Sequence, residues 1–432
     1  MSSILTNNGA MVALQTLKSI NSGLADTQKE ISTGKRVANS KDNSAVWAIS
    51  KVMEADVKGF KGISDSLNLG QSTVAVARQA AETTTDLLTQ IKGKVVAAQE
   101  ENVDRQKIQT DIDALRNQIS SVVSAAQFNG LNLLSNTEQV ADSGSVNILA
   151  SLDRSGTGVT ASDITVSKQD LGVGDSSIGT ALTALTTAAN NVTGFGDGAA
   201  AALTGAAVAP TGTTTFGGAA TDTVAAGTGF SIDITATAAN GPSNTTDRND
   251  IKYVARDGDT MADVTAGLAA AFNKYIESDL GADNVGTINA TASGNTLNFT
   301  GADVVGDNFS VAVQEYAANA ATTIGGRLQE LSTLDVTTQA GADSALEEIE
   351  TLIQTAIDSA AAFGSSQGRI ETQADFVSSL TDALKSGIGA LVDADMEAAS
   401  ARLQALQVQQ QLGVQALSIA NQAPQSLLSL FR

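Results

Sequence analysis

Carboxylates are the only abundant side chains of this 432-residue sequence that could carry out acid–base chemistry. It holds 46 Asp and Glu, 25 Lys and Arg, and neither His nor Cys. Without His, serine–histidine triads, His-containing zinc sites and HExxH metalloprotease sites are excluded. Without Cys, thiolate chemistry and disulfides are excluded. Paired carboxylates of the glycosidase type stay open, although 22 acidic residues between 136 and 340 make chance pairs common.

One group of acids could instead bind calcium. Asp247, Asp250, Asp257 and Asp259 lie close together in sequence, and oxygen ligands suit this ion. Their spacing does not match an EF-hand loop, so a solvated surface is the favoured interpretation. We expect no cofactor, no metal and no enzymatic activity.

The net charge of −21 opposes a nucleic-acid or anionic membrane partner. No window approaches 18 uninterrupted apolar residues, so no membrane-spanning helix is expected. The first positive side chain is Lys18, and no continuous apolar core precedes it, so we expect no cleavable signal. The protein then either stays in the cell or leaves by a route that reads no such signal.

Helical spacing dominates residues 1–135. The first stripe comprises Ala10, Leu14, Leu17, Leu24 and Ile31. A break follows at TGKRVANSKDNS, with Asp42 or Ser44 expected to cap the next helix. That helix is predicted to run from Val46 to Ala98. After QEENVD comes a regular stripe of Ile108, Ile112, Leu115, Ile119, Val122 and Ala126, and QFNGLNLL at 127–134 adds a Gly-containing turn.

Residues 136–342 differ in composition, being rich in Gly, Ala, Thr, Ser and Asp. Between 136 and 340 there are 22 acids and 7 bases. Alternation and β-branching predict strands at 231–238, 250–255, 295–300 and 309–316, with a helix at 260–276 opened by Thr260. This part is expected to be a β-rich outer domain.

The chain is helical again from 343 to 432. Three stripes are visible: Leu346, Ile349, Ile353, Ala356 and Ala360; Ile370, Val377, Leu380, Leu384, Ile388 and Leu391; and Ala401, Ala405, Val408, Leu412, Ala416 and Ile419. The predicted fold is mainly α with a β-rich insert, in which the terminal arms pack as an antiparallel coiled-coil bundle and an α+β or β outer domain projects from it. The predicted boundaries are 1–40, 41–135, 136–342, 343–390 and 391–432.

The two outermost segments, 1–40 and 391–432, form a lone helix pair in this scheme. Such a pair has little core and is expected to order only when identical copies cover it. The last residues, SIANQAPQSLLSLFR, support this idea: Ile419 completes a seam, Pro424 is expected to break the helix, and the apolar residues after it lack partners in one molecule.

At both ends the sequence resembles bacterial flagellin. The similar segments are ILTNNGAM, EISTGKRVANSKDNSAVWAIS, QFNGLNLL and IANQAPQSLLSLFR, in the family's order and at its distances from the termini. Residues 250–316 also resemble a small insert motif of flagellin and hook proteins.

The resemblance implies a structural subunit of the flagellar filament, secreted to the extracellular flagellum and used for motility. Segments 1–40 and 391–432 would form an inner tube, and segments 41–135 and 343–390 a helical spoke. Subunits would leave unfolded through the flagellar type III apparatus with an export chaperone, and would meet copies of themselves, hook-junction proteins and a cap protein. The inter-subunit contacts are expected at Ile4, Leu5, Leu14, Leu17, Leu24, Ile31, Leu403, Leu412, Ile419, Leu427, Leu428, Leu430, Phe431 and Arg432.

Two departures from the family pattern stand out. The step Asp42-Asn43-Ser44-Ala45-Val46 replaces an aspartate–aspartate and alanine–glycine step, which should change a local cap rather than the fold. In flagellins sensed by the animal Toll-like receptor, an arginine, a leucine and a glutamate stand where this chain has Gln90, Lys94 and Asp111. We therefore expect poor detection by that receptor.

Three other functions were weighed. A hook–filament junction protein would share these termini. A protease in the outer domain is excluded by the absence of His. A glycan-binding outer domain is disfavoured because only Tyr253, Tyr275 and Tyr316 could form sugar platforms there.

Overall fold

The computed structural model describes residues 7–155, 158–180, 182–185, 192–195, 198–236, 247–280 and 287–430. The side chains of residues 154, 155, 159, 279, 280 and 423–430 lie outside this description. The chain forms two compact units. The first contains residues 1–65, 151–161 and 374–432, and the second contains residues 66–150 and 162–373.

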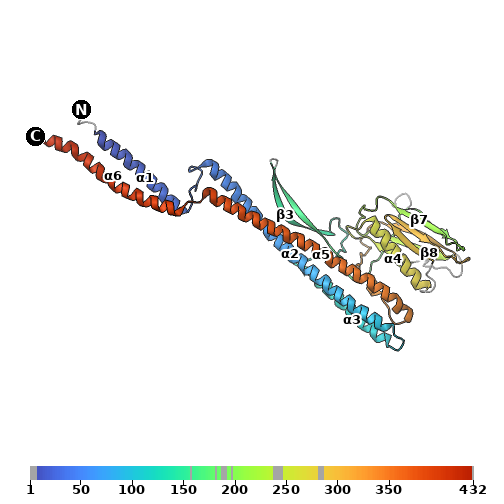
Figure 1. Ribbon diagram of the computed structural model, residues 1–432. Coiled ribbons are helices and arrows are strands. Elements are labelled where there is room, and N and C mark those ends of the chain that lie inside the picture. Colours follow the sequence, from blue (N-terminus) through green and yellow to red (C-terminus); the bar gives the residue numbers. More distant parts are fainter. Residues whose placement is uncertain are drawn as a thin grey trace. The chain divides into compact units, whose positions relative to one another are not determined.

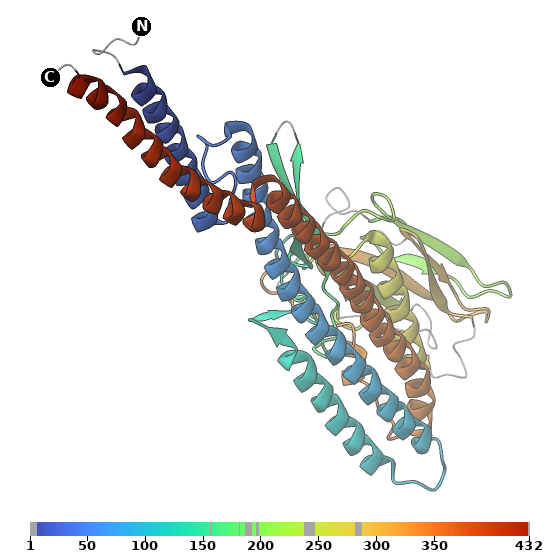
Figure 2. The same ribbon diagram turned by 60° about the vertical axis from the view of Figure 1, so that its left-hand side comes forward.

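In the first unit, helices α1 (Asn8–Thr33) and α6 (Met396–Leu430) lie side by side and antiparallel (Figures 1 and 2). Asn7 caps α1, since its side-chain oxygen accepts a hydrogen bond from the Ala10 amide at 3.1 Å. Gly34 ends α1 in the left-handed conformation at φ 66°, which glycine adopts without strain. The predicted break between residues 34 and 43 is confirmed.

The residue that caps α2 (Ser44–Ala98) is Asn43, so the prediction of Asp42 or Ser44 is wrong. The Asn43 side chain accepts a hydrogen bond from the Val46 amide at 3.1 Å. Asp42 is used elsewhere, because its carboxylate accepts the amides of Ala38 and Asn39 and pairs with Lys29 at 3.0 Å. An Asx residue one step later therefore supplies the cap.

The two breaks in the helices of this unit are joined to each other. The Arg36 and Val37 amides donate to the Val392 carbonyl, and the Ala394 amide donates to the Gly34 carbonyl. The Arg36 guanidinium adds a bond of 2.9 Å to the Leu391 carbonyl. We call residues 34–42 with 391–395 the joint.

Helices α2 and α5 (Gln339–Val392) pass through both units and form the antiparallel pair of the second. Buried residues of α2 recur in steps of four and three, the spacing of a coiled-coil seam: Ile63, Leu67, Gly70, Val74, Ala77, Ala81, Thr84, Leu88, Ile91, Val95 and Ala98. Side-chain contacts between Arg78 and Gln367 at 2.9 Å and between Lys92 and Glu350 at 2.5 Å fix the antiparallel register.

The seam of α5 is displaced from one predicted stripe. Its buried face comprises Ala342, Ala345, Ile349, Leu352, Ala356, Ser359, Phe363, Ile370 and Val377. Leu346 is exposed, and Ile353 and Ala360 are only half-buried, because small residues such as Ala342 and Ala345 occupy the seam instead. The stripe from Ile370 to Leu391 was placed correctly. The stripe of α3 (Arg105–Ala125) was also correct, with its residues buried or half-buried.

Two hairpins follow α3. Strands β1 (Gln127–Phe128) and β2 (Leu131–Asn132) meet at a turn in which Asn129 and Gly130 have φ of 51° and 81°, as predicted for QFNGLNLL. Strands β3 (Ser145–Ser155) and β4 (Gly158–Ser167) form a second, longer two-stranded sheet. This hairpin was not predicted.

A two-stranded connection, the neck, consists of residues 169–178 and 323–328. Ser177 and Thr323 exchange both backbone hydrogen bonds, at 2.9 and 2.8 Å, and the Leu328 amide donates to the Gly172 carbonyl at 3.0 Å. On the helical side, the amides of Gln169 and Leu171 donate to the carbonyls of Leu133 and Leu134. The neck therefore connects the helices to the β-rich domain.

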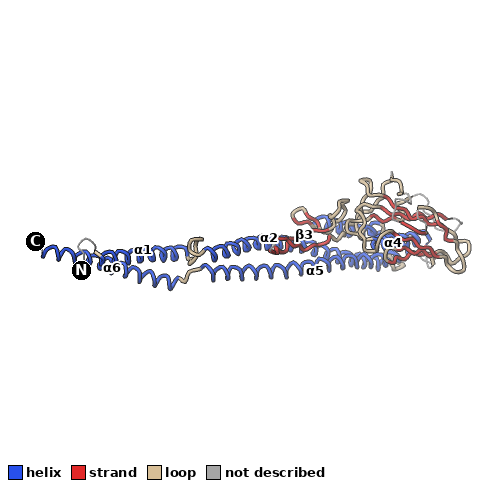
Figure 3. The backbone as a smooth tube through the Cα atoms, turned by 90° about the horizontal axis from the view of Figure 1, so that it is seen from above, coloured by secondary structure: helices blue, strands red, loops and turns tan. Residues whose placement is uncertain are grey.

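Within its described residues, the β-rich domain contains two antiparallel four-stranded sheets, and Figure 3 draws their strands in red. One has the order β10 (Asn289–Ser293), β11 (Thr296–Thr300), β7 (Thr211–Phe216), β5 (Val192–Gly194). The other has the order β6 (Ala201–Leu203), β12 (Phe309–Tyr316), β8 (Gly229–Ala236), β9 (Lys252–Val254).

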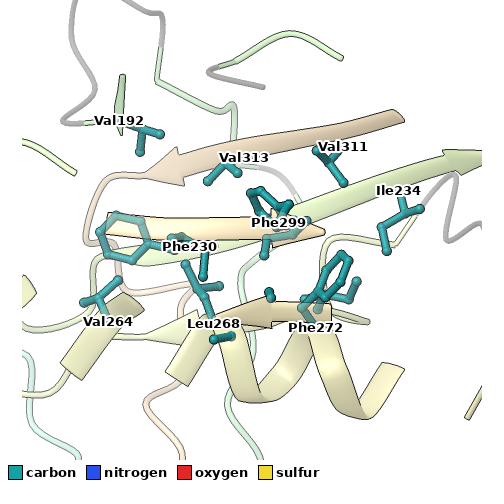
Figure 4. Close-up of a cluster of buried hydrophobic side chains, with 14 of the residues drawn as sticks. Val192, Phe230, Ile234, Val264, Leu268, Phe272, Phe299, Val311 and Val313 are labelled. Atoms are coloured by element: carbon teal, nitrogen blue, oxygen red, sulfur yellow. The ribbon is translucent and has the colours of Figure 1, made fainter. Parts of the chain in front are cut away.

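Both sheets and helix α4 (Met261–Leu280) share one apolar core (Figure 4). The Phe272 and Phe299 rings meet edge to face at 5.3 Å, and Phe216 meets Phe230 at 5.7 Å. Thr260 caps α4 as predicted. Its hydroxyl oxygen accepts a hydrogen bond from the Asp263 amide, and the Asp263 carboxylate accepts one from the Thr260 amide.

The four predicted strands are present as β8, β9, β11 and β12, and residues 237–238 of the first lie outside the described residues. Strands β5, β6, β7 and β10 were not predicted. They are short or rich in Ala and Thr, as in TGTTTF and NATAS, so their pairing depends on neighbouring strands more than on their own pattern.

Candidate assembly surface

The paired faces of α1 and α6 consist of small and apolar side chains that are only half-buried. The face of α6 comprises Leu403, Leu406, Gln410, Gly413, Leu417 and Ala420, in steps of three and four. Glycines allow close approach, since a Cβ on Gly413 would lie 3.2 Å from Leu17 and one on Gly23 would lie 3.6 Å from Leu406. Thr27 is the only residue of α1 with described burial that is fully buried. The pair therefore has almost no core of its own.

Polar contacts fix the register of this pair. The Asn7 side-chain amide donates to the Ala420 carbonyl at 2.8 Å, and the Gln410 amide donates to the Asn21 side chain at 2.7 Å. Between Arg402 and Arg432 the sequence contains no charged residue. Shape and neutral hydrogen bonds, rather than ion pairs, therefore set this contact.

A second apolar stripe of α6 lies away from α1. It comprises Ala401, Ala405, Val408, Leu412, Ala416 and Ile419, and all six are exposed. Val408 is 56%, Leu412 is 59% and Ile419 is 69% exposed. We call this the outer stripe. A helix with two separate apolar stripes can pack against two partners, and α1 covers only one of them.

The candidate assembly residues divide into three groups. Leu17, Leu24, Ile31 and Leu403 are half-buried in the α1–α6 pair. Leu14, Leu412 and Ile419 are exposed, so Leu14 does not belong to the α1 face as its stripe had suggested. Sequence reasoning missed Ala13, Ile20 and Thr27, which complete the spacing of that face.

The remaining candidates lie at the ends of the chain. Ile4, Leu5, Phe431 and Arg432 fall outside the described residues, as do the side chains of Leu427, Leu428 and Leu430. The expected break at Pro424 is wrong, because α6 continues through it to Leu430. A proline removes one helical hydrogen bond, and here the flanking residues still hold helical geometry.

The three residues of the expected altered receptor site lie on exposed parts of α2 and α3. Lys94 and Asp111 form an ion pair at 2.5 Å, with side chains that are 44% and 55% exposed. Gln90 is exposed one turn before Lys94 on α2. The structure therefore brings Lys94 and Asp111 together.

Asp257 and Asp259, two of the four acids considered for calcium, accept hydrogen bonds from other protein groups. Asp259 accepts from the Tyr253 hydroxyl and the Arg256 amide, and Asp257 accepts from the Gly144 amide at 2.6 Å. Within the described part of the chain, no three of its acidic side chains gather closely enough to hold a metal ion. None of the three tyrosines is exposed. Among the described helices, none is long and apolar enough to cross a membrane.

Both ends of the chain match models of a known protein family. Residues 4–139 match the bacterial flagellin N-terminal helical region, and residues 346–431 match the C-terminal helical region. Flagellin A of Rhizobium meliloti is 34% identical over 437 residues, with all of both chains covered. Flagellin FljM of Caulobacter vibrioides is 28% identical, covering 100% of this chain and 99% of that protein.

Among solved structures, FliC from Burkholderia pseudomallei is 15% identical with a TM-score of 0.30, covering 69% of this chain and 99% of that one. FlgL from Xanthomonas campestris is 12% identical with a TM-score of 0.33, covering 78% and 98%.

Paired terminal helices, an uncovered apolar stripe and a β-rich insert define a structural protein that associates with copies of itself. The full-length matches then identify the family: the chain belongs to the bacterial flagellins. It is a structural subunit of the flagellar filament, which is extracellular and serves motility, and it is not an enzyme. The predicted fold class is confirmed.

Proposed function

We propose that the outer stripe of α6 is the surface through which subunits join in the inner part of the filament. The observation that carries this proposal is the exposure of Val408, Leu412 and Ile419 on the side of α6 that α1 leaves uncovered. Burying one such side chain stabilises a contact by about 2 kcal/mol. A contact of this kind that does not close on itself generates a helical filament.

In this proposal the segments 1–40 and 391–432 form the inner tube, 41–135 and 343–390 form the spoke, and 136–342 faces solvent. The seven candidates at the extreme ends, from Ile4 and Leu5 to Leu427–Arg432, extend the same interface. The weak core of the α1–α6 pair supports ordering of these helices upon assembly, because a half-buried pair is marginal alone.

Membership of the flagellin family supports a proposal about export and the remaining partners. We infer that the subunit leaves the cell unfolded through the flagellar type III apparatus with a chaperone, and that it meets hook-junction and cap proteins. The absence of Cys supports this route, because disulfide crosslinks would hinder a chain that must thread through a narrow channel. Trapping the chain during export with a fused domain that resists unfolding tests it: secretion should stop.

The test of the interface uses two variants of the same helix. L412Q/I419Q makes two of the six outer-stripe residues polar, whereas V414Q changes a side chain that is 53% exposed but lies off the stripe. We expect the first variant to raise the critical concentration for seeded polymerisation at least tenfold and the second to leave it unchanged. Equal polymerisation of both variants and wild type would overturn the proposal.

Removal of residues 418–432 is a harsher version of the same test. We expect a folded monomer that does not polymerise, as measured by circular dichroism and electron microscopy.

We also propose that the Toll-like receptor detects this flagellin poorly. The supporting observation is the Lys94–Asp111 ion pair on exposed helix surface, where detected flagellins present a leucine. Purified monomer should give a weak signal in a receptor reporter assay, and Q90R/K94L/D111E should strengthen it. Full-strength activation by the wild-type monomer would exclude the idea.

A further inference from the structure

The turn between β9 and α4 makes contacts outside its own domain. This turn, ARDGDT at 255–260, is called the anchor turn here. It is closed by the Asp259 carboxylate, which accepts from the Arg256 amide at 2.8 Å and from the Tyr253 hydroxyl at 2.7 Å. Gly258 has φ 92°, which glycine accommodates. Asp259, one of the four acids considered for calcium, therefore shapes this turn.

Arg256 extends from the anchor turn into the neck. Its side chain donates to the Asp170 carboxylate at 3.1 Å on the outgoing strand and to the Gly325 carbonyl at 2.7 Å on the returning strand. Arg256 is 5% exposed, and among the described residues no other Lys or Arg is buried. One planar guanidinium thus joins both strands of the neck to the β-rich domain.

The positive charge of Arg256 lies beside acidic side chains that balance it. Asp170 and Asp259 are buried beside Arg256, and Arg327 approaches Asp259 at 3.7 Å. Asp170 also accepts the Gly172 amide at 3.0 Å, which fixes the outgoing strand. A buried charge of this kind is tolerated when it is paired and hydrogen-bonded, and Arg256 satisfies both conditions.

A second attachment comes from Asp257. Its carbonyl accepts from the Asn136 side chain at 2.9 Å, and its carboxylate accepts from the Gly144 amide at 2.6 Å. Asn136 and Gly144 precede the neck, on the segment between β2 and β3. The anchor turn therefore contacts three segments that lie outside the β-rich domain.

The anchor turn also contributes to the apolar core of the β-rich domain, because Ala255 is one of the buried residues of that core. The hydrogen bonds of the Arg256 side chain run to Asp170 and Gly325 of the neck and not to the apolar side chains of the core. Breaking the anchor should therefore loosen the domain on its neck while its core stays folded.

We propose that Arg256 is a positioning residue that fixes the outer domain to its neck, so that each subunit carries this domain as a rigid projection. The inference concerns the monomer and is independent of the outer stripe of α6.

Trypsin supplies a test on the full chain, because its sites report two separate events. Cleavage after Lys168 and Arg327 reports opening of the neck, and cleavage after Lys252 and Lys274 reports unfolding of the domain. We expect R256M to be cut at least tenfold faster after Lys168 and Arg327, with cleavage after Lys252 and Lys274 within twofold of wild type. R369M removes an exposed arginine of α5 and should match wild type at all four sites.

Two further variants separate positioning from simple charge balance. R256K keeps the positive charge but loses the planar guanidinium that bonds both strands of the neck. Its cleavage after Lys168 and Arg327 should therefore also be faster than in wild type, although slower than in R256M. D170L/R256M removes the buried pair as a unit; its thermal midpoint should recover relative to R256M, while neck cleavage stays fast. The proposal would be overturned if R256M were cleaved in the neck at the wild-type rate, or if its cleavage were accelerated equally at all four sites. It would also be overturned if R256K or D170L/R256M restored the wild-type rate of neck cleavage.

Discussion

At the scale of single residues, the carboxylates of this flagellin act as structural acceptors. Asp42 accepts the Ala38 and Asn39 amides and pairs with Lys29. Asp259 closes the anchor turn, and Asp104 caps α3 through the Lys107 amide. The many acidic residues of the sequence were compatible with catalysis or calcium binding, whereas in the structure these carboxylates accept hydrogen bonds from the protein. Only coordinates could reveal this, because an acceptor role depends on which amides the fold brings near.

The pKa of Asp42 is held below its usual range chiefly by the hydrogen bond from Lys29; burial opposes this effect, and the backbone amides of Asn39 and Ala38 lower the pKa further. A depressed pKa means that the joint gains stability above the unfolded value of about 4 and loses it as the pH falls through the folded value. Hydrogen exchange of the Ala38 and Asn39 amides should accelerate in that acidic range, beyond the intrinsic change with pH.

D42N provides the check on this pH prediction. It removes the charge at every pH, so its exchange at Ala38 and Asn39 should be fast at neutral pH and should show no transition in acid. D382N, at an exposed aspartate of α5 with a local Lys385 pair, is the matched control. A transition of the same size in D42N would rule out Asp42 as its source.

Burial has the opposite effect on Asp170. Desolvation raises the pKa of this carboxyl above its ordinary value, although Arg256 lowers it in part. A raised pKa favours the folded state at low pH, so Asp170 is not a source of acid unfolding. D170N keeps this position neutral at every pH. Because wild type gains stability as the pH falls through the raised pKa and D170N does not, the thermal midpoint of wild type should rise relative to that of D170N in acid. A wild-type midpoint that falls relative to D170N in acid would contradict this assignment.

At the scale of elements, helical periodicity was enough to locate the long helices but not always their buried faces. The α3 stripe was correct because Ile and Val carry a strong signal. On α5 and α6 the faces that pack against other helices of the chain contain Ala, Gly and Gln. The larger side chains on the exposed faces therefore led to the wrong face being predicted as buried. In α6 this error is informative, because the strongest apolar stripe is the uncovered one. Short strands such as β6 and β10 could not be predicted, since pairing rather than pattern defines them.

The neck depends on a glycine that no periodicity identifies. A Cβ on Gly326 would lie 1.9 Å from the Gly172 carbonyl oxygen, a backbone atom that cannot turn aside. G326A should therefore destabilise the second unit by about 1–3 kcal/mol, the usual cost of forcing extra volume into a packed site. Thermal unfolding measures the loss.

The same strand pair offers a matched control. A Cβ on Gly174 would meet nothing within 4 Å, so G174A should unfold close to wild type. An unchanged midpoint for G326A would show that the neck can separate at this point at little cost.

At the scale of the whole molecule, the negative charge is concentrated in the middle of the chain, which we propose to face solvent. Residues 136–340 carry 22 acids and 7 bases, a net charge of −15 (7 − 22) out of −21, whereas α6 between Arg402 and Arg432 is uncharged. In the proposed assembly, copies attract one another through apolar helices and repel one another through acidic outer domains. This proposed division would keep the free subunit dispersed and make assembly sensitive to ionic strength.

The repulsion between outer domains predicts a specific salt dependence. The Debye length is about 30 Å in 0.01 M salt and about 8 Å in 0.15 M salt, so neighbouring domains interact strongly only in the dilute buffer. The critical concentration for seeded polymerisation should fall as NaCl rises across this range. E138K/D303K reverses two exposed acids of residues 136–340 and should give a shallower dependence, because it removes four of the fifteen net charges. K385E/D382K, which exchanges an exposed pair without altering net charge, should keep the wild-type slope. If all three proteins share one slope, the salt effect arises from the terminal helices, and the acidic outer domain does not oppose assembly.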